Sequence, residues 1–263
     1  MTTVADILKY VETLAPTYMK MDWDNVGLLC GSRETPVTKV LMALDPFEGV
    51  CREAAEWGAE LIVTHHPMIF APLKSVTEET TVGRSIMTLC RHGISAVNAH
   101  TNLDCAPGGV NDVLAATLGL KDVETIPPFF RDDQGRQWGL LRRGRVEEQP
   151  LSQFLETVKS SLNAEGLRYV DGGKPVCVVA VGGGHCSDEL MSAFEAGCDT
   201  FVTADIKYNE FWDAQALGMN LIDAGHFATE NPVVAVLAEK IAAAFPGIQV
   251  KISETHRDCM KFY

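Results

Sequence analysis

The first feature of the sequence that could do chemistry is a pair of adjacent histidines, His65 and His66. They follow the apolar run Glu60-Leu-Ile-Val-Thr64, which is typical of a buried strand. Adjacent side chains on an extended chain point in opposite directions, and Pro67 favours a bend directly after them, so the two imidazoles can serve different ligands. The alternative is a pair of polar residues that cap a strand, but two imidazoles leaving a buried strand favour a binding site.

Two further histidines are each followed, four positions later, by a carboxylate: His100 by Asp104, and His226 by Glu230. Residues four apart on a helix share one face about 5–6 Å apart, so each pair can reach one metal centre. A carboxylate favoured by the helix dipole would explain either pair alone. Combined with the adjacent histidines, the pairs form a donor set suited to Zn, Mn, Fe, Co or Ni. If a carboxylate bridges, the set suits two metals about 3.5–4 Å apart, which activate water for hydrolysis without a redox cofactor.

The elements that must position these residues follow an α/β pattern, in which apolar runs alternate with helical stripes. We expect strands at 40–44, 60–64, 94–98, 138–142, 176–181, 201–203 and 219–222, and helices at 49–57, 83–91, 151–162, 187–196 and 231–244. Four of the seven histidines then fall at strand ends. Open α/β sheets place their sites at the carboxyl ends of strands, so the expected elements and the donor set agree.

An internal repeat indicates that the chain is built from two similar α/β halves. Residues 58–64, Gly-Ala-Glu-Leu-Ile-Val-Thr, align with residues 197–203, Gly-Cys-Asp-Thr-Phe-Val-Thr, and the two His-x-x-x-acid pairs are offset by 126 positions. Any two α/β units look partly alike, but the recurrence of that pair after equivalent strands favours duplication. We therefore expect a first half, 1–125, and a second half, 126–263. The first contributes His65, His66, His100 and Asp104, and the second contributes His226 and Glu230.

Composition excludes several classes of function. With 22 basic and 35 acidic residues the net charge is −13, which disfavours broad binding to nucleic acid or to anionic membranes. No segment approaches the roughly 20 apolar residues of a membrane span, and no signal sequence opens the chain, so a cytoplasmic location is expected. Eight cysteines without a Cys-x-x-Cys pair read as reduced thiols rather than as a zinc or redox motif.

Other segments have weaker interpretations. Gly182-Gly-Gly-His185 is either a phosphate-holding turn or a tight turn from strand to helix, and it lacks the Gly-Lys-Ser/Thr of a P-loop. The segment Asp22-Trp-Asp24-Asn25-Val-Gly27-Leu either lines a cleft or makes an Asx turn. His92 before Gly93 reads as a helix C-terminal residue, and His256 in the polar tail receives no role.

Taken in order and spacing, five motifs across nearly the whole chain resemble the type 2 GTP cyclohydrolase I homologs, also called NGG-interacting factor 3-like proteins. The motifs are Trp23-Asp-Asn-Val-Gly-Leu28, Thr64-His-His-Pro67, His100-Thr-Asn-Leu-Asp104, Thr203-Ala-Asp-Ile-Lys-Tyr208 and Asp223-Ala-Gly-His-Phe-Ala-Thr-Glu230. The resemblance implies a dinuclear metal site in a cleft between the two halves, and a toroidal homohexamer. It also implies the compact form of the family, without an inserted middle domain.

Carried over by motif, the metal ligands implied by the resemblance are His65, His66, Asp104, His226 and Glu230. His100 moves to a supporting or proton-transfer role, and Asp205 and Lys207 could steer or bind substrate. The sequence departs from the family at Asn209, where many members carry a histidine, and at His185 in the glycine turn.

The function implied is that of a metal-dependent hydrolase acting on a nucleotide-like small molecule, as in opening of the GTP imidazole ring. The alternative is a non-catalytic ring protein for metal storage or delivery, or a protein-interaction hub, because fold and ligands do not fix function. An open coordination position would favour catalysis. A nucleic-acid factor is disfavoured by the net charge.

Overall fold

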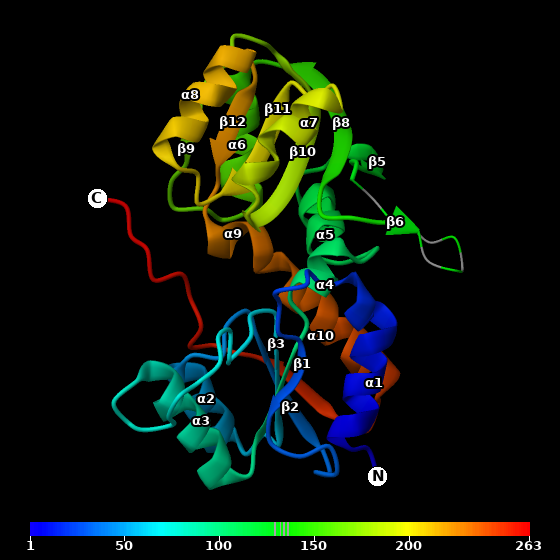
Figure 1. Cartoon of the computed structure of the whole chain (residues 1–263), viewed down its shortest axis with the longest axis vertical. Helices are drawn as coiled ribbons and strands as arrows, with labels where there is room; N and C mark the ends of the chain where they lie inside the picture. Colours follow the sequence, from blue (N-terminus) through cyan, green and yellow to red (C-terminus); the bar gives the residue numbers. More distant parts are fainter. Residues whose placement is uncertain (129, 132, 134, 136) are drawn as a thin grey trace. The chain divides into compact units, whose positions relative to one another are not determined.

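The computed structural model describes residues 1–128, 130–131, 133, 135 and 137–263, which form a mixed α/β chain (Figure 1). The predicted fold class is confirmed. The chain divides into two compact units. Unit 1 comprises Met1–Leu103 and Val234–Arg257, and unit 2 comprises Asp104–Val233 and Asp258–Tyr263. These units differ from the sequence halves 1–125 and 126–263 in two ways. The first boundary falls after Leu103, so Asp104 lies in unit 2, and residues 234–257 return to unit 1.

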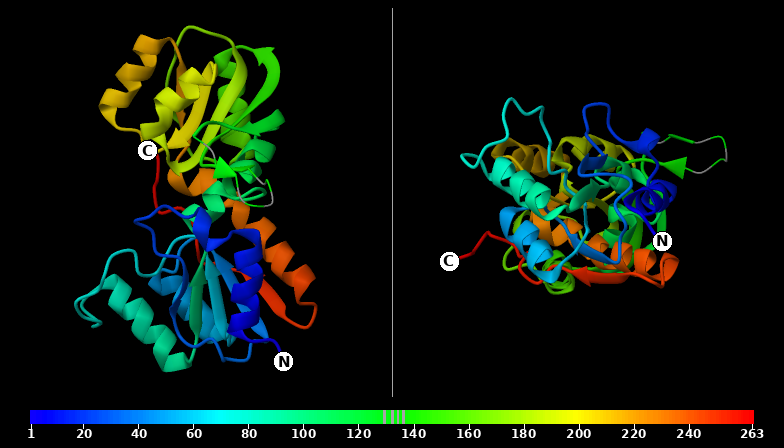
Figure 2. Two further views of the ribbon diagram at one scale, coloured as in Figure 1. Left: turned by 45° about the vertical axis from the view of Figure 1, so that its right-hand side comes forward. Right: turned by 90° about the horizontal axis from the view of Figure 1, so that it is seen from below.

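Unit 1 is a five-stranded sheet covered by helices on both faces (Figures 1 and 2). Its strands, in spatial order, are β1 (Gly27–Cys30), β4 (Ser95–Asn98), β3 (Leu61–Thr64), β2 (Lys39–Ala43) and β13 (Gln249–Ile252). All neighbours are parallel except β1 and β4. The helices are α1 (Val4–Leu14), α2 (Glu48–Trp57), α3 (Thr81–His92) and the greater part of α10 (Pro232–Ala244), with a short 3-10 turn, η1 (Thr17–Met19).

The core of unit 1 forms where α2 and α3 pack on the sheet. Val50 and Ala54 of α2 and Leu89 of α3 are buried against Leu41 of β2 and Ile62 of β3. Because side chains alternate across a strand, the burial of all four residues of β3 means that both faces of the strand are covered, as in most parallel sheets. Strand β3 ends at Thr64, and the candidate ligands His65 and His66 follow it directly.

Unit 2 is built on a six-stranded sheet in which the central strands are parallel. The spatial order is β5 (Lys121–Thr125), β8 (Arg142–Gln149), β10 (Val176–His185), β11 (Thr200–Ala204), β12 (Asn220–Asp223) and β9 (Arg168–Val170). A two-stranded ribbon, β6 (Phe130–Arg131) and β7 (Gln137–Trp138), lies apart from it. The helical elements are α4 (Thr101–Cys105), which runs on from unit 1, α5 (Val110–Thr117), α6 (Leu151–Ser161), η2 (Ser187–Glu189), α7 (Leu190–Glu195), α8 (Tyr208–Leu217) and α9 (His226–Glu230).

Alternation along β10 separates two cores in unit 2. Val179 and Val181 face one layer, which contains Phe154 of α6. Ala180 faces the other, which contains Ala193 of α7 and Ala214 of α8. Helices therefore cover both faces of this sheet as well.

The predicted duplication is visible in the order of elements. The series β2, α2, β3, α3, β4, α4 recurs as β10, α7, β11, α8, β12, α9, and in each series the three strands are parallel neighbours. The aligned glycines, Gly58 and Gly197, both follow a helix with positive φ, +73° and +79°. This left-handed conformation ends the helix and turns the chain into the next strand.

Most predicted elements are confirmed, including the helix that ends at His92 before Gly93. The predicted strand 138–142 is wrong, because β7 ends at Trp138 and β8 begins at Arg142. The Arg142 guanidinium is buried and donates to Asp112 and to the carbonyl of Gly139, which holds the intervening segment as a loop. The predicted helix 187–196 begins with the 3-10 turn η2. Among the described residues, no helix combines the length and apolar character needed to cross a membrane.

Candidate metal centre

Three of the predicted histidines gather in unit 1 as an imidazole cluster, consisting of His65, His66 and His100. One ring nitrogen from each lies within 4.8 Å of the others. The first two directly follow β3 and the third follows β4 by two residues, so neighbouring parallel strands deliver them to the same sheet edge. Ring centroids are 4.9 Å apart for His65 and His66, and 5.2 Å for His65 and His100. The convergence predicted at strand ends is present within this unit.

Each ring of the imidazole cluster has its Nδ1 against an oxygen acceptor. The His65 Nδ1 lies 2.9 Å from the backbone carbonyl of Ala99, the His66 Nδ1 2.6 Å from Asp45 Oδ1, and the His100 Nδ1 2.8 Å from Asp24 Oδ1. An acceptor at Nδ1 places the proton there and leaves the lone pair on Nε2. This is the tautomer that binds a metal through Nε2, oriented as metal-binding histidines are in known sites.

Asp24 is one of these acceptors and was not assigned to the site by sequence. Its side chain is fully buried; it accepts from His100 and from the backbone N–H of Thr101 at 3.0 Å. Burial alone would raise its pKa, but the hydrogen bonds from His100 and Thr101 outweigh burial and lower the pKa to about 2. Asp24 therefore stays ionised and holds His100 in place, a role that the predictions for its segment did not include.

Asp45 holds a second histidine in addition to His66. His256, in the segment after β13, has its Nε2 2.9 Å from Asp45 Oδ2. Burial opposes ionisation of Asp45, but the hydrogen bonds with His256 and His66 hold its pKa well below the usual range. The tail is anchored nearby, because Glu53 accepts from Ser253 Oγ and from the backbone N–H of Glu254. His256, given no role from sequence, thus belongs to the support of His66.

In unit 2 the remaining predicted residues form a carboxylate cluster, consisting of Asp104, His226 and Glu230. One carboxylate oxygen of Asp104 lies within 4.8 Å of one of Glu230, and both residues are buried. The His226 Nε2 lies 3.0 Å from Glu230 Oε2, as expected for positions four apart on one helix. Two buried carboxylates beside an imidazole form an anionic site for a cation.

His226 is positioned by Asp205, whose Oδ2 lies 2.6 Å from the ring Nδ1. Burial disfavours the imidazolium, but hydrogen bonds to Asp205 and Glu230 dominate and raise the pKa of His226 to about 10. Asp205 itself has a left-handed backbone with φ of +53°, which is uncommon for a residue other than glycine. A substrate role for Asp205 stays a prediction, and the structure adds a contact in which Asp205 holds His226.

Two of the histidine–carboxylate pairs have the same spacing. Asp45 precedes His66 by 21 residues, and Asp205 precedes His226 by 21 residues. In each case the carboxylate follows one strand and the imidazole follows the next parallel strand. Neighbouring strands lie about 4.8 Å apart, which brings such a pair into hydrogen-bond range. An aspartate that follows the preceding strand, 21 residues before the histidine, was the signal that could have identified the supporting carboxylates from sequence.

The glycine turn is not a phosphate-holding loop. Its backbone N–H groups are engaged within the unit: Gly183 donates to Asn111 Oδ1 at 2.7 Å, and Gly184 donates to Thr229 Oγ1 at 3.0 Å. Gly184 has φ of +61°, and a Cβ there would collide with Glu230 Oε1 and lie 3.0 Å from His226 Nε2. The turn therefore makes room for the carboxylate cluster.

Other candidates from sequence lie apart from these clusters within unit 2. Lys207 is exposed and ion-pairs with Asp188 at 3.1 Å and with Glu210 at 3.2 Å. His185 is exposed, with Nε2 3.3 Å from the same Asp188. Asn209 is an exposed residue of α8. None of the three contributes a donor atom to the carboxylate cluster as the described residues define it.

Comparison with known proteins gives a consistent set of relatives. The family described as Duf34/NIF3 (NGG1p interacting factor 3) matches residues 2–259. A GTP cyclohydrolase 1 type 2 homolog from Clostridium perfringens is 35% identical over 262 residues, and one from Clostridium acetobutylicum 32% over 265, each covering 98% of both chains. The crystal structure of a Bacillus cereus protein related to NIF3 has a TM-score of 0.91 at 27% identity, covering 100% of this chain and 99% of that one.

Proposed function

Since this chain belongs to the Duf34/NIF3 family, we propose that it is a dinuclear divalent-metal hydrolase acting on a nucleotide-like small molecule. The proposed ligands are His65, His66, Asp104, His226 and Glu230.

The observation that carries the proposal is the common orientation of the imidazole cluster. Three rings with an acceptor at Nδ1 present the lone pair of Nε2, and a structural role for three buried or half-buried histidines would not require the same tautomer three times. The carboxylate cluster supplies the negative charge, and Gly184 leaves space beside it that any Cβ would fill. The donor chemistry therefore fits borderline divalent ions. When bound, such ions lower the pKa of a water molecule and polarise the bond to be broken.

His100 is proposed to move a proton rather than to hold metal. Its Nδ1–H is donated to Asp24, whose low pKa keeps that carboxylate ionised. With Nδ1–H held by this carboxylate, Nε2 is the ring nitrogen placed to accept a proton and later return it.

The first experiment is elemental analysis of purified protein reconstituted with Zn, Mn, Fe, Co or Ni. Wild type should hold about two ions per chain, whereas His66→Ala and Glu230→Ala should each lose metal. His100→Ala should keep metal. His92→Ala is the matched control, because His92 is an exposed histidine at the end of α3 and should keep full occupancy. Equal metal content in all five proteins would refute the ligand assignment.

The second experiment measures turnover of GTP and a panel of nucleotides and phosphoesters by metal-loaded protein. Metal-dependent hydrolysis that His100→Ala abolishes without loss of metal would support the proposal. Full metal occupancy with no turnover of any substrate would favour the alternative of metal storage or delivery.

We also propose that the chain assembles as a homohexameric ring, as the family resemblance implies. Light scattering coupled to size-exclusion chromatography tests this directly. A mass of about six chains is expected, and a stable monomer or dimer would exclude the ring.

A further inference from the structure

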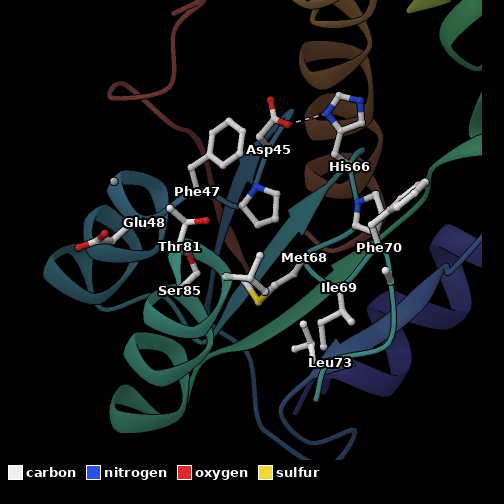
Figure 3. A pocket seen from close by; sticks show the side chains of 15 residues that line it. Asp45, Phe47, Glu48, His66, Met68, Ile69, Phe70, Leu73, Thr81 and Ser85 are labelled. Atoms are coloured by element: carbon white, nitrogen blue, oxygen red, sulfur yellow. Dashed lines mark hydrogen bonds and ion pairs between the residues drawn. The ribbon is translucent and has the colours of Figure 1, made fainter. Parts of the chain in front are cut away.

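Unit 1 contains a cavity of about 520 Å³ that opens beside the imidazole cluster (Figure 3). Its walls come from the segment after β2, the segment after β3 and the start of α3. Asp45 and His66 lie together at one edge, joined by their hydrogen bond, and Leu73 lies at the other (Figure 3). Small-molecule sites typically have volumes of about 300–1,000 Å³, so this cavity has the size of a binding site.

The walls are mainly apolar and partly aromatic. Met68 and Ile69 form the floor, and the side chains of Phe47 and Phe70 are 60% and 62% exposed on either side. Large aromatic side chains exposed at a cavity rim are costly in water and are typical of ligand sites rather than of ordinary surface. Phe70 also lies 5.7 Å from the exposed ring of Trp23, measured between centroids.

The carboxylates of two acidic residues line the cavity. Among the described residues that line it there is no lysine or arginine, whereas Asp45 and Glu48 are both present. The guanidinium groups of Arg52 and Arg84 are engaged by Glu48 at 3.0 and 2.8 Å. A phosphate or carboxylate group entering the cavity would meet the Asp45 and Glu48 carboxylates, and the two guanidinium groups are already paired with Glu48.

We propose that this cavity binds an uncharged aromatic or heteroaromatic ring of the small-molecule substrate, with the anionic groups of the substrate held outside it. The bond to be hydrolysed would then lie near His66, where the cavity meets the imidazole cluster. Phe70 links the two, since its ring centroid is 6.3 Å from that of His100. Binding of the ring does not depend on the proposed hydrolase function, whereas hydrolysis of the bound substrate rests on it.

The binding test uses indole and indole-3-carboxylate, which differ by one negative charge, with metal-free protein at pH 8. Titrations followed by ligand NMR should give saturable binding of indole and about tenfold weaker binding of indole-3-carboxylate. Equal affinity for the two probes, or no saturable binding of indole, would overturn the proposal.

Two variants locate the binding. Phe70→Ala should weaken indole at least threefold, because stacking against an exposed ring is lost. Leu73→Arg should reverse the preference toward indole-3-carboxylate by placing a cation in the cavity. Trp212→Ala is the control, since Trp212 on α8 is a comparably exposed aromatic residue, 58%, outside the cavity. Indole affinity that falls in Trp212→Ala but not in Phe70→Ala would place binding elsewhere and overturn the inference.

The two proposals fail in different ways. Charge-selective indole binding without metal-dependent hydrolysis of any substrate would support the cavity and count against the hydrolase. If metal-loaded protein hydrolyses phenyl acetate faster than phenyl phosphate, and Phe70→Ala raises KM for phenyl acetate, both are supported. Hydrolysis with KM unchanged in Phe70→Ala would overturn the role of the cavity alone.

Discussion

Replacing Asp24 by asparagine tests whether the fold holds His100 through an ionised carboxylate. The carboxylate accepts from the His100 ring and from both the N–H and the hydroxyl of Thr101. An amide has a single oxygen, so the Asp24→Asn side chain would turn its NH₂ group toward at least one of these donors. The variant should therefore lose stability as well as the orientation of His100.

The magnitude comes from the pKa of Asp24. Its fall from 3.8 to about 2, against the cost of burial, is stabilisation of the folded state by about 2 kcal/mol at roughly 1.4 kcal/mol per unit. Since the folded-state pKa lies below the unfolded value, this stabilisation is fully present above about pH 5. It is lost as the pH falls through the unfolded value toward the folded one, and about half should remain near pH 3.

The assay is urea unfolding of wild type and Asp24→Asn between pH 7 and pH 3, followed by circular dichroism. The difference in unfolding free energy should be about 2 kcal/mol at pH 7 and about half of that at pH 3. Asp22→Asn is the matched control, because Asp22 is an exposed aspartate in the same segment. A difference below about 0.5 kcal/mol at pH 7, or one that does not change with pH, would refute the reasoning.

Three further predictions concern the residues that support the proposed ligands. In metal-free protein, Asp205→Asn should lower the pKa of His226 from about 10 toward its ordinary value, because one of two carboxylate partners is removed; an unchanged NMR titration would contradict this. His256→Ala should weaken metal binding by about tenfold in a chelator competition, because His256 holds Asp45 and Asp45 orients His66. Wild-type affinity in this variant would show that His256 does not support the ligand. Gly184→Ala should lose metal, since its Cβ would collide with Glu230, whereas Gly93→Ala, with a similar φ but open space, should lose about 1 kcal/mol and keep metal.

Elements could be predicted from sequence where the apolar pattern lies within the element itself. Strand β3 and helix α6 are examples, because a run of four buried residues and a stripe on one helix face are both readable without a partner. Strand β8 was largely missed. Its residues are mostly charged, and it is held by pairing with β10 on one side and β5 on the other, which no local pattern records. Helix α8 was missed because only Glu210 and Ala214 along it are buried.

The clustering of the candidate histidines could be predicted from sequence, whereas the residues that orient them could not. A histidine at a strand end is visible in sequence, since the strand is recognisable by its apolar run. Its acceptor is not, because the partner of His100 lies 76 positions away in an N-terminal segment whose local pattern gives no hint of it. The tautomer of each ring, and with it the ability to hold a metal, is therefore a property of tertiary structure.

The shared 21-residue spacing reflects the geometry of neighbouring parallel strands. Neighbouring parallel strands in register place Ala43 beside Thr64 in one sheet and Thr203 beside Asp223 in the other. A carboxylate shortly after the first strand of each pair then meets an imidazole shortly after the second, whatever the intervening helix contains. Because strand spacing fixes this contact, any two neighbouring parallel strands can carry such a pair. The two pairs do not occupy equivalent positions in the repeat: Asp45 and His66 follow the first and second strands of their series, whereas Asp205 and His226 follow the second and third. The contact between Asp24 and His100 has no counterpart at this spacing, so its loss should affect His100 without disturbing His66.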